Sequence, residues 1–340
     1  MRIVNNLKFL FVLAFVSCSS SGHIGTREQP LKKQPQIIVW YQIAGLSSEH
    51  LPLIKYDNSQ QEYAKSIENF QCLGQMWSYN FYEIRPSVRA RMASQLSGDP
   101  DVMDRCEDLK GNFIWDYATQ VGYKTVLLEN EFHQEATFEK YLNCDNFPGT
   151  KPTLIKMTAA KDAVSTFHFQ DTKSQILAGV YYDKSCNEKS CFSGWQNNIK
   201  ALISKNLSSG EKSFIIFQDT TFLKALKTKK ILEAKDFLIE LTNNLKWIYE
   251  LPNKEILVLI TGTNSLPIEF PDKGKTWAEY QKFGSNIIYH RESLVSPIYA
   301  WGASSENFCG VYGEEDILRR IFWSPDDSIF SLSKLNKVFN

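Results

Sequence analysis

The sequence predicts an α/β fold in which helices cover both faces of a mostly parallel β-sheet. Short, continuous apolar runs at 36–41, 124–128, 213–217 and 255–260 alternate with stretches of helical pattern. Runs that are apolar at consecutive positions are typical of strands buried on both faces, and such strands occur mainly in parallel sheets. No internal repeat interrupts this order, so one large domain is expected.

The strands and helices are expected in a definite order along the chain. Strands are expected at 36–41, 73–81, 124–128, 213–217, 255–260 and 297–301, and helices at 60–70, 88–96, 112–121, 229–249 and 314–322. Gly98 and Gly122 end two of these helices, because glycine readily adopts the left-handed conformation of a helix C-terminus. The helix at 229–249 is amphipathic, and its apolar side comprises Leu232, Phe237, Leu238, Leu241, Leu245 and Ile248.

The composition excludes several classes of protein. The 340 residues include 38 Lys and Arg against 38 Asp and Glu, a formal net charge of zero, with 43% hydrophobic and 22% charged residues. These values are typical of a globular protein rather than a disordered, collagen-like or coiled-coil chain. A balanced charge lacks the basic excess typical of nucleic-acid-binding proteins, so no nucleic-acid partner is expected.

The first residues have the features of an export signal. Arg2 and Lys8 precede an apolar run of eight residues at 9–16. A membrane-spanning helix needs roughly 20 apolar residues, so this run fits the apolar region of a secretory signal better. Residues 1–17 are therefore predicted to be a signal peptide.

The residues around Cys18 resemble a bacterial lipobox, in which the cysteine is lipidated and becomes the new N-terminus. Phe15 stands where leucine is usual, and the alternative is an ordinary signal peptide with an incidental cysteine. The resemblance implies a lipoprotein anchored in the cell envelope through Cys18, with residues 18–35 as a flexible tether. The absence of Asp after Cys18 favours the outer membrane. The mature chain would have 340 − 17 = 323 residues and a formal charge of 36 − 38 = −2, with 36–340 as its single domain.

The cysteine count predicts disulfides in this oxidising setting. Six of the seven cysteines remain once Cys18 is assigned to lipid, which permits three disulfides. Cys186 and Cys191 flank a short polar loop and are expected to form a local pair, whereas the sequence does not assign the other pairings. A zinc site is the competing interpretation, but the chain has no Cys-x-x-Cys pair and no adjacent histidine cluster.

Several segments resemble, in the same order, those of the alkaline phosphatase superfamily, nearest its sulfatase-like branch. The strongest local likeness is Phe113 to Thr125, which resembles that family's helix, Gly-Tyr-x-Thr and strand. The other similar segments are 37–51, 87–98, 256–262, 295–302 and 313–321. The resemblance implies a sulfatase-like α/β domain.

The family's metal positions are occupied by unsuitable residues in this chain. The reaction needs divalent metals held by Asp and His at strand ends, where they activate a nucleophile and neutralise the transferred group. The resemblance places Ala44 at the Asp of the first strand and Thr263 with Asn264 at a later Asp-His pair. A methyl group cannot bind a metal, and the other two side chains substitute poorly for carboxylate and imidazole. No metal or other cofactor is therefore expected.

A few residues could still carry catalysis. Asp219 follows a predicted strand and could be a surviving metal ligand, or it could cap the following helix. His290 lies where the family often has a histidine, although a lone histidine is more often structural. Ser87, at a helix start, is the candidate nucleophile or an ordinary N-cap, and the sulfatase signature Cys-x-Pro-x-Arg is absent.

Three arginines near Ser87 are candidates for binding an anion. Arg85, Arg89 and Arg91 could hold a sulfate or phosphate, or they could form a solvated helix face. An aromatic group, Trp77, Tyr79, Phe81 and Tyr82, could stack on a sugar or could be core and edge packing.

These observations favour a degenerate member of the superfamily that acts as a non-catalytic binding or scaffold protein of the envelope. Its ligand would be a glycan, an anion or a protein. The alternative is a divergent hydrolase or transferase for phosphate or sulfate esters that uses Ser87, Asp219 and His290 with an altered divalent metal site.

Overall fold

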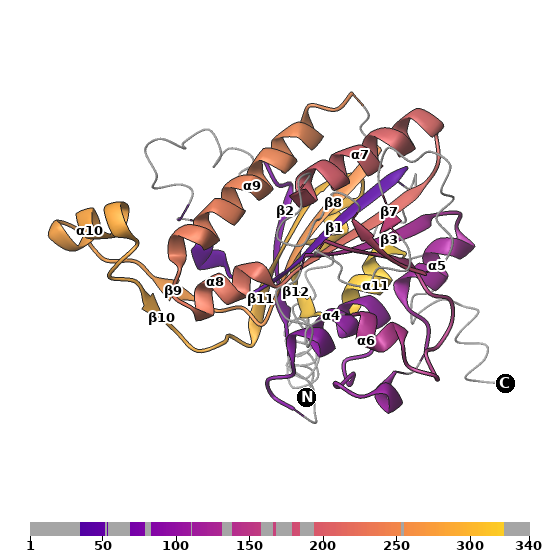
Figure 1. Cartoon of the computed structure of the whole chain (residues 1–340), viewed down its shortest axis with the longest axis horizontal. Coiled ribbons are helices and arrows are strands. Elements are labelled where there is room, and N and C mark those ends of the chain that lie inside the picture. The colour runs from indigo at the N-terminus through magenta and orange to yellow at the C-terminus, as the bar shows by residue number, and fades with distance from the viewer. Residues whose placement is uncertain are drawn as a thin grey trace, which may run out of the picture.

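The computed structural model describes residues 35–51, 53, 69–78, 83–109, 111–130, 138–157, 166–167, 179–183, 194–252 and 255–322. A ten-stranded sheet forms the centre, in the order β12-β2-β11-β8-β1-β7-β3-β4-β6-β5 (Figure 1). Its strands are β1 (Ile37–Ala44), β2 (Cys72–Trp77), β3 (Lys124–Asn130), β4 (Thr153–Lys156), β5 (Thr166–Phe167), β6 (Gly179–Asp183), β7 (Ser213–Asp219), β8 (Ile256–Thr263), β11 (Val295–Gly302) and β12 (Gly310–Gly313). A separate two-stranded ribbon pairs β9 (Ile268–Glu269) with β10 (Ile288–Tyr289).

The sheet is mostly parallel, which confirms the predicted fold class. Strand β11 runs antiparallel to its neighbours β2 and β8, and every other neighbouring pair in the sheet is parallel. All eight residues of β1 are buried, because β7 and β8 pair with both of its edges and helices cover both of its faces. This burial explains why the strand reads as a continuous apolar run.

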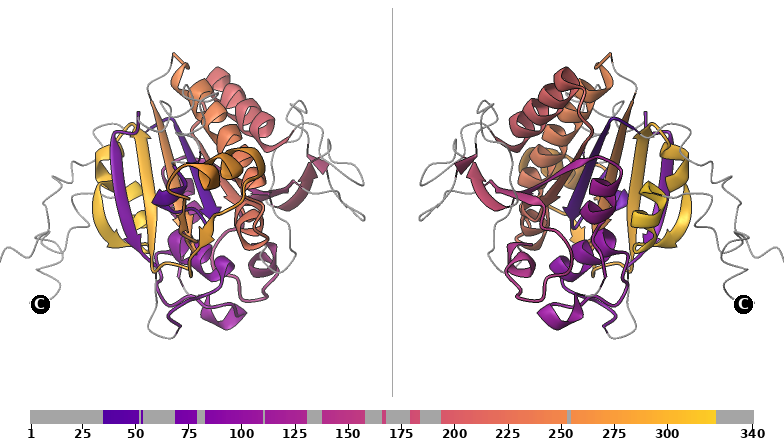
Figure 2. Two further views of the ribbon diagram at one scale, coloured as in Figure 1. Left: turned by 90° about the vertical axis from the view of Figure 1, so that its left-hand side faces the viewer. Right: turned by 90° about the vertical axis from the view of Figure 1, so that its right-hand side faces the viewer.

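Helices lie on both faces of the sheet (Figures 1 and 2). The α-helices are α4 (Val88–Ser97), α5 (Ile114–Gln120), α6 (Glu139–Leu142), α7 (Gly194–Ser209), α8 (Thr221–Lys227), α9 (Ile231–Tyr249), α10 (Lys275–Phe283) and α11 (Asp316–Ile321). Short 3-10 turns are η1 (Ser48–His50), η2 (Cys106–Asp108) and η4 (Ser305–Phe308). Helices α7, α8 and α9 contribute to one apolar core, and α4, α5, α6 and α11 to the other.

Most predicted elements are present, with some differences. The strand expected at 73–81 ends at Trp77, and residues 60–68 of the helix expected at 60–70 lie outside the described residues. Leu232, expected on the apolar side of α9, is 42% exposed. The other five residues expected on that side are buried, and Ile231 and Ala234 are buried in addition, so Leu232 falls off the stripe that this spacing defines.

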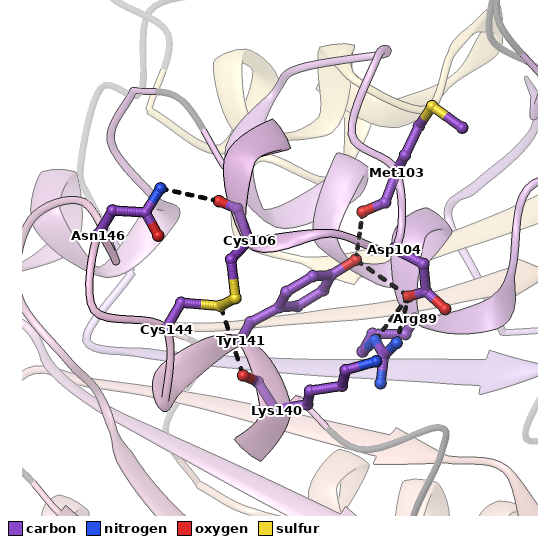
Figure 3. Close-up of a disulfide and its surroundings, with 8 residues drawn as sticks. All are labelled: Arg89, Met103, Asp104, Cys106, Lys140, Tyr141, Cys144 and Asn146. Carbon is purple, nitrogen blue, oxygen red and sulfur yellow. Dashed lines mark hydrogen bonds and ion pairs between the residues drawn. A yellow bond between two sulfur atoms is a disulfide. The ribbon is translucent and has the colours of Figure 1, made fainter.

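Two disulfides link segments on the α4 side of the sheet. Cys72 in β2 is bonded to Cys309, and Cys106 in η2 is bonded to Cys144 (Figure 3). The expected Cys186–Cys191 pair lies outside the described residues. Within the part of the chain that the structure describes, no helix has the length and apolarity needed to cross a membrane.

Candidate functional site

The carboxyl ends of three neighbouring strands meet at one edge of the sheet. In the register of the sheet, Ile43 in β1 lies beside Asp219 in β7, and Ala44 lies beside Thr263 in β8. The side chains of Ala44, Asp219 and Thr263 are fully buried. In open α/β sheets ligands bind outside the carboxyl ends of the strands, so this edge is the candidate site.

Asp219 is fully engaged by protein donors at this edge. Its carboxylate accepts hydrogen bonds from Asn130 Nδ2 at 2.6 Å, Thr221 Oγ1 at 2.7 Å and the Phe222 amide at 2.8 Å. Burial raises the pKa of Asp219 to about 6, and these hydrogen bonds oppose the rise. The Phe222 amide lies in the first turn of α8, so Asp219 binds the start of that helix from the position before its N-cap, Thr220.

The ends of the other two strands, β1 and β8, carry no charged side chain that could bind a metal. Ala44 presents a methyl group, and the buried Thr263 Oγ1 has no hydrogen-bond partner among the described residues. Asn264 adopts a φ of 46°, and its Nδ2 donates to the Pro86 carbonyl at 2.9 Å. In the described part of the chain, no three His, Cys, Asp or Glu side chains are placed to hold a metal ion together. This donor set does not fit a hard divalent cation.

The Asn264–Pro86 hydrogen bond brings the start of α4 to the same edge. Ser87 is the N-cap of α4, where its Oγ accepts a hydrogen bond from the Ala90 amide at 3.2 Å. The structure thus places Ser87 beside the strand ends in a capping role.

Two of the three candidate anion-binding arginines are engaged inside the fold. Arg89 pairs with Asp104 at 2.6 Å and Arg91 with Glu314 at 2.8 Å, and both arginine side chains are only 3% exposed. They form neither a solvated face nor an open anion site, because nearly all of α4 is buried. Arg85 lies at the surface, where its Nε donates to the Glu292 carbonyl at 3.4 Å.

His290 directly follows the β9–β10 ribbon, which projects from the body of the domain (Figure 1). Its half-exposed ring lies 3.4 Å, from Nε2 to Oε2, from the carboxylate of Glu269. Its backbone amide donates to the Pro267 carbonyl. The structure therefore gives His290 a surface partner on the ribbon.

A buried glutamine network lies beneath this edge and was missed in the sequence. Gln218 donates to Gln42 at 2.7 Å, Gln42 donates to Gln95 at 3.0 Å, and Gln95 donates to Glu314 at 3.3 Å. Burial raises the pKa of Glu314 to about 7, and Arg91 opposes this rise. The sequence does contain an indication of this network, since Gln42 and Gln218 lie near the ends of apolar strands. Polar groups buried in such strands need hydrogen-bond partners.

His50 is a second buried polar residue that sequence reasoning did not single out. Its Nδ1 accepts a hydrogen bond from the Ser47 amide at 3.0 Å, so the neutral ring carries its proton on Nε2. Burial lowers the pKa of His50 to about 3. The imidazole is therefore neutral at physiological pH, and it packs edge-on against Phe222.

A cleft of about 230 Å³ opens at this edge of the sheet, beside β2 and β11. Its polar lining residues are Ser47, Ser48, Glu49, Gln75, Ser293 and Ser296.

The arrangement of this sheet and its helices matches solved structures of one enzyme class. The alkaline phosphatase from the Antarctic bacterium TAB5 superposes with a TM-score of 0.62 at 11% identity, covering 86% of this chain and 98% of that one. The chain has the alkaline phosphatase fold. The Thermus thermophilus alkaline phosphatase gives a TM-score of 0.60 at 8% identity, covering 88% of this chain and 94% of that one.

A third solved structure that is similar to this chain is that of a synthase. The lipoteichoic acid synthase LtaP from Listeria monocytogenes gives a TM-score of 0.52 at 11% identity, covering 90% of this chain and 77% of that one. No protein-family model and no curated protein matches the sequence. The alkaline phosphatase fold agrees with the resemblance found in the sequence, and the strand ends described above are those at which that resemblance implied metal ligands.

Proposed function

We propose that this chain is a non-catalytic binding or scaffold protein of the bacterial envelope, built on an alkaline phosphatase fold without its metal centre. One observation supports this proposal most strongly. At two strand ends the family resemblance implies metal ligands, but β1 carries Ala44 and β8 carries Thr263 at these positions.

The remaining carboxylate does not restore a metal site. Asp219 is fully buried and accepts hydrogen bonds from Asn130, Thr221 and Phe222, so its carboxylate is already stabilised by the protein. Phosphate and sulfate ester transfer on this fold depends on metal ions that activate the nucleophile and neutralise the transferred group. A domain without suitable ligands retains the scaffold and its surfaces but lacks that source of catalysis.

The test uses the full chain purified in detergent, with an active alkaline phosphatase measured in parallel. Elemental analysis is expected to find no stoichiometric zinc, magnesium, manganese or calcium, and chromogenic phosphate and sulfate esters are expected to remain intact. Stoichiometric metal that disappears in Asp219→Ala would overturn the proposal. Ester turnover that disappears in Ser87→Ala would overturn it as well.

Export and anchoring through Cys18 are part of this proposal and lie outside the described residues. The apolar run at 9–16 and the lipobox-like residues before Cys18 support them. Labelling of cells with a palmitate analogue is expected to mark the wild-type chain in the outer-membrane fraction and not the Cys18→Ala variant. Equal labelling of the two chains would refute the anchor.

A divergent hydrolase or transferase of phosphate or sulfate esters is the second candidate. The hydrogen bond from Asn264 to the Pro86 carbonyl favours it, because it holds Ser87 at the same edge as the strand ends. This candidate predicts ester turnover that requires Ser87, Asp219 and His290. Loss of turnover in Ser87→Ala but not in Ser208→Ala, an exposed serine on α7, would establish it.

A further inference from the structure

The end of α10 meets the start of α9 on the side of the domain that carries the β9–β10 ribbon. Gly284, the C-cap of α10, packs against α9, since a β-carbon on this glycine would lie 3.1 Å from Leu232 Cγ. Figure 1 shows α10 projecting from the domain beyond the start of α9. Leu232 and Phe283, the residue before Gly284, are 42% and 65% exposed. The surface at this contact therefore carries two exposed apolar side chains.

The same surface is basic, although the whole chain has no net charge. Residues 224–235, which cover the end of α8 and the start of α9, contain five lysines and one acidic residue. That acidic residue, Glu233, already pairs with Lys230 at 2.6 Å. Lys229 lies between the two helices and is exposed, and it makes no ion pair with any residue that the structure describes. Its charge is therefore free to meet an anionic partner.

A second cation lies beside the exposed ring of α10. Lys282 is exposed, and its Nζ lies 5.1 Å from the centre of the Phe283 ring. Glu279, one turn earlier, is engaged by Lys275 at 3.8 Å and by Asn286 at 2.9 Å, and Lys282 has no carboxylate partner in the described part of the chain. A lysine beside an apolar side chain can keep its ammonium group in water while its neighbour enters an apolar phase.

We propose that this α9–α10 face, formed by Lys229, Leu232, Lys282 and Phe283, docks on a membrane surface that contains anionic lipids. Apolar side chains flanked by lysines are typical of protein surfaces that bind at the headgroup boundary of a bilayer, where the lysines meet anionic headgroups. A soluble anion would satisfy the lysines but would leave both apolar side chains in water. The inference adds a second membrane contact to the anchor proposed at Cys18, and it does not depend on the metal positions at the strand ends.

Photo-crosslinking to lipid tests this face in the full chain. The chain is reconstituted into vesicles of phosphatidylcholine alone or mixed with phosphatidylglycerol, each with a trace of a phospholipid whose acyl chain carries a diazirine. Equal amounts of vesicle-bound chain are recovered by flotation, and mass spectrometry identifies the labelled peptides. Labelling of the peptides that contain Leu232 and Phe283 is expected to be about tenfold or more stronger in the anionic vesicles, because each lysine near such a surface favours binding about fivefold.

A charge variant with a matched control connects the labelling to the two lysines. Lys229→Glu combined with Lys282→Glu is expected to reduce labelling in the anionic vesicles to the level in phosphatidylcholine. The control combines Lys140→Glu with Lys151→Glu, which changes the net charge equally at exposed lysines outside this face. It is expected to leave the labelling of both peptides unchanged.

An apolar variant separates insertion from simple attraction of charge. Phe283→Ser is expected to weaken labelling of the Leu232 peptide severalfold, because less apolar surface enters the bilayer. Val311→Ser removes a similarly exposed apolar side chain from β12 and is expected to leave that labelling unchanged.

Two outcomes would overturn the docking face. One is equal or absent labelling of these peptides in the two kinds of vesicle, in a chain that is folded by circular dichroism. The other is labelling in the anionic vesicles that survives in full when Lys229 and Lys282 are both replaced by Glu. Either result leaves the proposed non-catalytic role and the Cys18 anchor in place, because metal content, ester turnover and palmitate labelling test those.

Discussion

Arg91 and Glu314 form an ion pair of 2.8 Å in which the two side chains are only 3% and 4% exposed. The pair joins α4 to the segment that leads into α11, and Gln95 on α4 donates a further hydrogen bond to the same carboxylate. The pair therefore fixes how α4 and α11 pack against each other beneath the candidate site.

Removal of one partner of this pair is expected to destabilise the domain strongly. Glu314→Gln removes the carboxylate that lies 2.8 Å from the buried Arg91, which typically costs about 3–5 kcal/mol of unfolding free energy at a pH above the raised pKa of about 7, where Glu314 is ionised. Urea unfolding followed by circular dichroism measures the loss. The exposed pair Lys230–Glu233 is the control, and Glu233→Gln is expected to cost less than about 1 kcal/mol. Similar losses of unfolding free energy in Glu314→Gln and Glu233→Gln would show that the buried pair stabilises the domain no more than the exposed pair does.

The buried carboxyl of Asp219 predicts a pH dependence of stability. Its pKa is about 6 in the folded state against 3.8 for the ordinary value, so the folded state binds more protons between these pH values. The unfolding free energy therefore falls as pH rises from 3.8 to 6, by a total of about 3 kcal/mol from this group. Urea unfolding measured at a series of pH values tests the slope.

The contribution of Asp219 is isolated by a difference between variants. Asp219→Asn is expected to remove the contribution of Asp219, so that the unfolding free energy of the variant falls less, or rises more, than that of the wild type between pH 3.8 and 6; the opposing contributions of His50 and Glu314 remain in both proteins. Asp272→Asn, on an exposed loop residue, is expected to keep the wild-type slope. A wild-type slope in Asp219→Asn would mean that burial does not raise the pKa of this carboxyl.

The central strands could be predicted because burial on both faces leaves a local signature. β1, β7 and β8 each contain at least four consecutive apolar residues, and α9 shows a helical stripe. Helix α7 has no comparable local signal, since it interleaves polar residues with its buried positions. It was missed because its packing on the sheet, rather than its own pattern, determines it.

The candidate site was predictable in part. The resemblance placed Ala44, Asp219 and Thr263 at strand ends, and the topology then brings those ends together. The fate of Arg91 could not be predicted, because its partner Glu314 lies 223 residues away in sequence. Long-range pairing of this kind leaves no mark on the local pattern around either residue.

The Cys106–Cys144 disulfide is expected to stabilise the segment around Asp104. It spans 38 residues, and Tyr141, between the two cysteines in sequence, donates to the Met103 carbonyl at 2.7 Å (Figure 3). Replacement of both cysteines by alanine is expected to cost about 3–4 kcal/mol of unfolding free energy, because the unfolded chain regains freedom. Urea unfolding measures the loss, and Cys18→Ala is expected to show none. An unchanged midpoint in the double variant would contradict this expectation.

The two described disulfides sharpen the prediction for the remaining cysteines. They use Cys72, Cys309, Cys106 and Cys144, so the pair still open in the mature chain, if Cys18 carries lipid, is Cys186 with Cys191.

Trypsin cuts after Lys184 and Lys189, which separates Cys186 from Cys191 onto two peptides. Non-reducing peptide mapping after alkylation of free thiols is expected to find these peptides joined, because a short polar loop allows two nearby cysteines to meet in an oxidising compartment. In Cys191→Ser the thiol of Cys186 should become alkylated. Alkylation of both cysteines in the wild-type chain would instead place this loop in a reducing environment, and would count against export of the protein.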